Sequence, residues 1–61
     1  MLEYCKIILK KVSFDSLLFD KELRKSIGYL VPREGQELIV WLKIHHAEYT
    51  EIIENIQQLF F

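Results

Sequence analysis

Three side chains of the 61-residue chain have the chemistry to bind a soft metal ion: Cys5, His45 and His46. A metal site needs several such ligands in one place. Adjacent histidines on a helix point about 100° apart, so His45 and His46 do not close around one ion. We therefore predict no metal and no cofactor, with His45 buried or at the boundary of a buried face and His46 in solvent. A metal- or ligand-binding helical assembly that combines Cys5 and His45 is an alternative.

Nucleophilic catalysis is the second chemistry to test against the sequence. A reactive Cys5 requires a nearby histidine and an oxyanion site, whereas its helical spacing with Leu2 and Leu9 is typical of a small core residue. Only two glycines are present, Gly28 and Gly35, so the chain has no glycine-rich phosphate loop. Acidic residues at every third position indicate the solvated side of a helix: Glu48, Glu51 and Glu54. We predict that the protein is not an enzyme.

The charge balance bears on partners. The formal net charge is −1, which lacks the basic excess that attracts phosphate backbones, so we do not expect nucleic-acid binding. A small helical regulator that contacts nucleic acid is the alternative. It would use the basic side chains of the first half of the chain: Lys6, Lys10, Lys11, Lys21, Arg24 and Lys25.

Cysteine usage and apolar runs bear on location. A single cysteine excludes an internal disulfide, which favours a reducing compartment. The apolar runs at residues 7–9 and 38–42 are far too short for a signal-peptide core or a membrane span. We therefore expect a soluble, cytoplasmic protein with no membrane association.

The elements that position these residues are predicted to be helices, in one domain over residues 1–61. The first helix covers residues 2–12. Ser13 is the expected N-cap of a second helix over residues 14–27, with Phe14 and Leu17 among its buried side chains. Gly28 is expected to end that helix in a left-handed conformation.

The last predicted element is one long helix that includes residues 38–60 and begins either at Pro32 or after Gly35. Alternation of apolar residues over 38–44 also suits a strand, but no second strand is present to pair with it. The fold class is therefore all-α, a small unit of two short helices and one long helix.

The long helix carries an apolar stripe at heptad-like spacing from Leu38 to Leu59. Hydrophobic residues make up 51% of the chain, more than a unit of this size buries on its own, so we predict self-association, with a dimer favoured. Trp41 and Tyr49 are the expected anchors. The predicted interface consists of Trp41, Leu42, His45, Tyr49, Ile52, Ile56 and Leu59. The predicted function is a non-enzymatic interaction or adaptor module, possible partners being a second copy or an unidentified protein.

Overall fold

The computed structural model describes residues 1–61 and is entirely helical, which confirms the all-α prediction. The predicted long helix is instead two helices separated by a short turn. The elements are α1 (Leu2–Lys11), α2 (Ser16–Tyr29), α3 (Pro32–His45), the 3₁₀ turn η1 (Ala47–Tyr49) and α4 (Thr50–Phe60).

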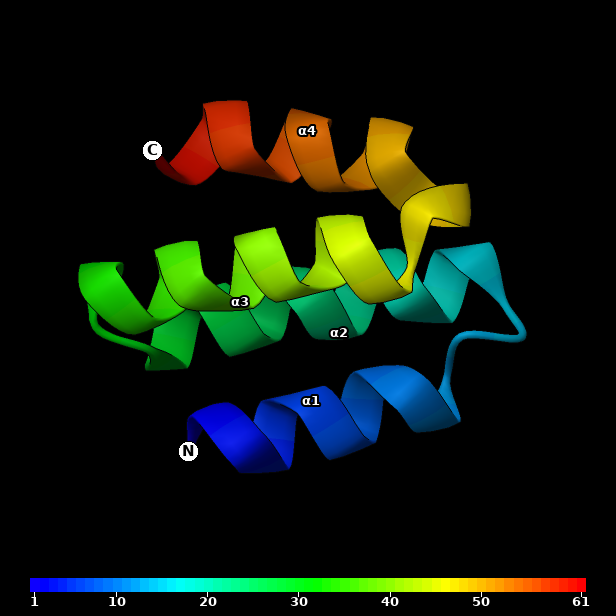
Figure 1. The fold of residues 1–61 in the computed structure, drawn as a ribbon, viewed down its shortest axis with the longest axis horizontal. Coiled ribbons are helices and arrows are strands. Elements are labelled where there is room, and N and C mark those ends of the chain that lie inside the picture. The colour runs from blue at the N-terminus through cyan, green and yellow to red at the C-terminus, as the bar shows by residue number, and fades with distance from the viewer.

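The helices run up and down in turn, so that successive helices are antiparallel (Figure 1). The pair α2 and α3 forms the middle of the molecule, and α1 and α4 lie on opposite sides of it (Figure 1). Both α1 and α4 pack against each member of the central pair. Short connections between antiparallel neighbours give this topology in helix bundles.

Each helix contributes side chains to a single core. Burying an aliphatic or phenyl side chain of this kind contributes about 1.5–3 kcal/mol. The large apolar residues with no exposed surface are Leu9, Phe19, Leu23, Leu38, Leu42, Ile53 and Ile56. The core therefore depends on residues from both halves of the predicted long helix.

The α1 helix lies where the sequence predicts it, ending one residue early at Lys11. Glu3 in its first turn and Lys10 and Lys11 in its last turn complement the helix dipole. Cys5 and Leu9 are buried, one turn apart, as expected for small and apolar residues at that spacing.

The start of α2 differs from the prediction. Asp15, not Ser13, is the N-cap: its carboxylate accepts hydrogen bonds from the amides of Leu17 at 2.9 Å and Leu18 at 3.2 Å. The Ser13 hydroxyl instead donates to the Lys10 carbonyl at 2.8 Å, at the end of α1. A carboxylate is the better cap because it adds negative charge at the positive end of the helix dipole.

The predicted burial of Phe14 and Leu17 is also wrong. Phe14 is 79% exposed in the turn before α2, and Leu17 is 80% exposed on its outer side. Three consecutive apolar residues on a helix point in three directions, so only one of Leu17, Leu18 and Phe19 reaches the centre. The core takes Phe19, the largest of the three.

The end of α2 is set by Pro32 and not by Gly28. Gly28 is inside the helix, and no glycine of the chain has a positive φ. The helix continues to Tyr29, after which Leu30 and Val31 are extended, with ψ of 148° and 156°. A residue before proline is driven out of the helical region by contact with the proline ring. Pro32 then begins α3 at its first turn, one of the two predicted starts.

The predicted helix over residues 38–60 breaks at His46, whose φ of −133° and ψ of 53° are not helical. A continuous helix of that length would extend roughly 33 Å, beyond the 26 Å longest dimension of the molecule. The break lets α4 fold back on α3, where Lys43 Nζ lies 3.0 Å from Gln57 Oε1 and the Phe61 ring packs over Gly35. Tertiary packing thus overrides a continuous helical pattern.

We expect Gly28→Ala to raise the free energy of unfolding by about 0.5–1 kcal/mol, because alanine is the better helix former and its methyl group meets no atom within 4 Å. Chemical denaturation measures the change. The matched control, Gly35→Ala, gains less because its Cβ would lie 2.8 Å from Phe61 Cζ. Destabilisation by Gly28→Ala would instead indicate the left-handed position predicted from the sequence.

We expect Asp15→Ala to lower the free energy of unfolding by about 1 kcal/mol, since two amides of the first turn of α2 lose their acceptor. Ser13→Ala is the comparison. It removes only an exposed hydroxyl bond at the end of α1 and should cost less. An equal or larger loss for Ser13→Ala, in the same urea titration, would contradict Asp15 as the cap.

Candidate functional site

The predicted interface residues do not lie on one continuous surface, because the chain turns back at His46. Leu42 and Ile56 have no exposed surface, and Tyr49 and Ile52 are partly buried against the same core. Leu59 is 64% exposed near the end of α4. The remaining two, Trp41 and His45, lie together near the end of α3: Trp41 is half-buried and His45 is exposed.

Tyr49 anchors the chain to itself. Its hydroxyl donates a hydrogen bond to the carbonyl of Ser13, in the turn between α1 and α2. Its ring stacks on Phe19 with 4.4 Å between ring centroids. One side chain therefore ties the start of α4 to the first half of the chain.

The two histidines exchange the environments predicted for them. His46 is buried, at 9% exposure, with its ring centroid 5.8 Å from Phe19 and 5.4 Å from Trp41. Its Nδ1 lies 3.8 Å from a carboxylate oxygen of Glu48. His45 is exposed, and its ring centroid lies 4.9 Å from that of Trp41. The reversal follows from the helix break at His46. In a continuous helix this side chain would point to solvent, whereas after the break it points into the core.

Trp41 is held in place from several directions. The His45 and His46 rings contact it from the end of α3, and the Lys6 ammonium lies 5.3 Å from the ring centroid. A cation over an indole face is a favourable electrostatic contact. Lys6 also pairs with Glu3, one turn earlier on α1, at 3.2 Å from Nζ to the carboxylate oxygen. The indole is thus preorganised and half-buried.

Around this indole is an open, shallow hollow of about 550 Å³, which we call the Trp41 face. Two apolar side chains of this face are exposed to solvent: Val40 is 58% exposed and Ile44 is 69% exposed. The residues of the Trp41 face are Lys6, Arg33, Gln36, Glu37, Val40, Trp41 and Ile44.

The sequence prediction missed Val40 and Ile44 as surface residues. They lie one turn apart on the side of α3 opposite Leu38 and Leu42, which face the core. A helical wheel restricted to residues 32–45 separates the two sides. The exposed side of α3 is hidden in the sequence pattern when the helix is assumed to continue to residue 60, because the wheel then mixes residues of α3 and α4.

The other groups with potential chemistry are the metal ligands and the charged side chains. No group of three or more histidine, cysteine or acidic side chains is close enough to hold a metal ion. Among the basic residues, Lys6 and Arg24 are held in ion pairs, with Arg24 Nε 2.7 Å from Asp20. The acidic series is exposed, as predicted: Glu48, Glu51 and Glu54.

No family model, curated protein or solved structure matches the chain. No helix combines the length and the apolar composition that crossing a bilayer requires. The Trp41 face is therefore the candidate site on its own geometry.

We expect Tyr49→Phe to lower the free energy of unfolding by about 1 kcal/mol, because the Ser13 carbonyl loses its donor while the stack on Phe19 is kept. Denaturation followed by circular dichroism measures the loss. The control, Tyr4→Phe, removes a hydroxyl from a residue that is 60% exposed and should change stability little. If the two substitutions lowered the free energy of unfolding equally, the Tyr49 hydroxyl would not stabilise the fold as stated.

Proposed function

We propose that the chain is a non-enzymatic interaction module that forms a homodimer through the Trp41 face. The observation that carries this proposal is the exposure of Val40 and Ile44 beside a half-buried, preorganised Trp41. Aromatic residues fixed before binding lose little entropy on association, which is why they often dominate interface energies. A grouped apolar surface of this kind is typical of an interaction site.

The size of the molecule is compatible with a dimer. The chain exposes 4148 Å² in total. A stable interface covers about 800 Å² of each partner, which is about a fifth of this surface. A two-fold axis uses the same surface on both copies, so each apolar residue is buried twice. The outer side of α3, together with the adjoining part of α1, provides the contact.

Charges on the Trp41 face suit contact with an identical surface. Lys6 and Arg33 are basic and Glu37 is acidic. Arg33 and Glu37 make no ion pair within the chain, although they lie one turn apart on α3. Because both signs are present, two copies can meet without the repulsion that a surface of one sign would produce.

We expect sedimentation equilibrium to show a concentration-dependent dimer that Ile44→Asp disrupts. Each copy would place a charge at the apolar contact, and the loss of two buried side chains raises the dissociation constant by about 100-fold. Val40→Asp should act in the same direction. Neither change touches the core, so the circular dichroism spectrum should stay helical.

Leu17→Asp is the matched control, because Leu17 is equally aliphatic and 80% exposed but lies on α2, outside the Trp41 face. It should leave the dimer intact. A wild-type chain that stays monomeric at all concentrations would overturn the proposal. If Leu17→Asp dissociated the dimer and Ile44→Asp did not, the interface would lie on α2 instead.

A further inference from the structure

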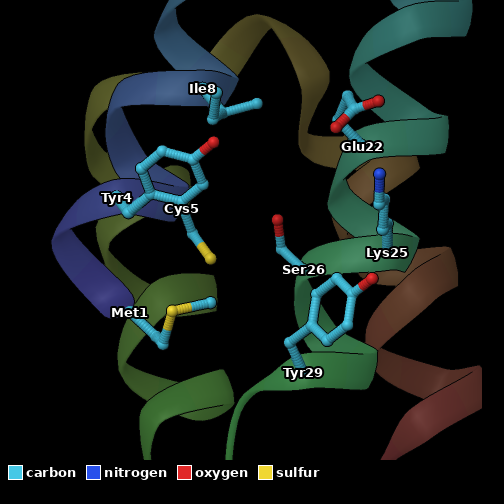
Figure 2. A pocket seen from close by; sticks show the side chains of 8 residues that line it. All are labelled: Met1, Tyr4, Cys5, Ile8, Glu22, Lys25, Ser26 and Tyr29. Carbon is cyan, nitrogen blue, oxygen red and sulfur yellow. The ribbon is translucent and has the colours of Figure 1, made fainter.

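A second hollow lies between α1 and α2 and shares no residue with the Trp41 face. We call it the α1–α2 cleft. It encloses about 110 Å³. Figure 2 shows side chains from both helices gathered around it: Met1, Tyr4, Cys5, Ile8, Glu22, Lys25, Ser26 and Tyr29. Most of the lining is apolar or aromatic, with a few polar groups, which is the usual composition of a ligand site.

Ser26 is the polar group at the centre of the argument. The residue is 6% exposed, and its hydroxyl points into the cleft (Figure 2). A serine inside a helix commonly bonds back to the carbonyl one turn earlier. Ser26 does not: its hydroxyl makes no hydrogen bond within the chain. No fully buried side-chain oxygen or nitrogen of the chain lacks a partner, so the Ser26 oxygen is reached from the open side of the cleft and is available to a bound molecule.

The walls of the cleft suit a flat apolar body. The Tyr4 ring comes from α1 and the Tyr29 ring from α2, and the sulfur atoms of Met1 and Cys5 lie between them on the α1 side (Figure 2). Sulfur atoms make favourable contacts with aromatic rings. The cleft, at about 110 Å³, is smaller than the roughly 150 Å³ apolar cavity that is known to accept benzene, so it holds no more than one ring, part of which lies in its open mouth.

The charges at the cleft favour a neutral ligand. Glu22 and Lys25 both line the α2 side, and neither makes an ion pair within the chain. An anion would be attracted by Lys25 and repelled by Glu22, and a cation would meet the opposite combination. A ligand without charge avoids both the repulsion and the loss of its own hydration.

We propose that the α1–α2 cleft binds a neutral monocyclic aromatic compound that carries a hydroxyl group, the chemical class of phenol. The ring occupies the space between Tyr4, Tyr29 and the two sulfur atoms. The ligand hydroxyl exchanges a hydrogen bond with Ser26. This site is independent of the dimer proposed above, because the two surfaces have no residue in common.

Phenol itself is the probe, titrated into the full ¹⁵N-labelled chain and followed by amide chemical shifts. We expect saturable shifts concentrated in α1 and α2 around Cys5 and Ser26, with a dissociation constant of about 1 mM. Ser26→Ala should weaken phenol binding about tenfold, the value of one hydrogen bond. Ser16→Ala, at an exposed position of the same helix, should leave the affinity unchanged.

Benzene isolates the hydroxyl contribution. It should bind the wild-type chain about tenfold more weakly than phenol, and the two ligands should bind Ser26→Ala with similar affinity. Benzoate and benzylamine should both bind more weakly than phenol. The proposal fails if the shifts do not saturate or spread over the whole surface. It also fails if Ser26→Ala binds phenol as well as the wild-type chain does.

Discussion

Burial of Phe19 is the contact on which the rest of the structure depends. Its side chain has no exposed surface, and it meets the Tyr49 and His46 rings at the point where the chain turns back. A phenyl ring of that size needs cover from more than one helix. The turn after α3 supplies that cover, and the Tyr49 hydroxyl fixes it to the Ser13 carbonyl. A residue of α2 thus helps to fix the place where the C-terminal half turns back.

This dependence explains what the sequence could and could not predict. The helical class and α1 follow from local signals, namely period and charge at helix ends, whereas proline geometry makes Pro32 only one of two starts that the sequence allows for α3. The break at His46 has no local signal, because no glycine or proline lies near it and the apolar period continues through it. The break is favourable because it brings Tyr49 and His46 onto Phe19 and buries Ile53 and Ile56 in the core, and a single sequence does not show those contacts.

The same break decides which side of α3 is available to a partner. In a continuous helix the stripe that contains Leu42 and Ile56 would be the exposed one, and the sequence prediction placed the interface there. Folding α4 back buries both residues in the core of the chain. The opposite side of α3, with Val40 and Ile44, has no helix to cover it. The candidate surface could be located only after the core was known.

Both candidate surfaces depend on α1, a helix of ten residues. An isolated helix of that length is marginal in water, so α1 forms because it docks on α2 and α3. Consecutive residues serve different surfaces, since Cys5 lines the α1–α2 cleft while Lys6 lies over Trp41. They point about 100° apart on the helix, which is what separates the two surfaces. Docking of one short helix therefore completes both surfaces: its detachment would remove one wall of the α1–α2 cleft and would take Lys6 away from the Trp41 face.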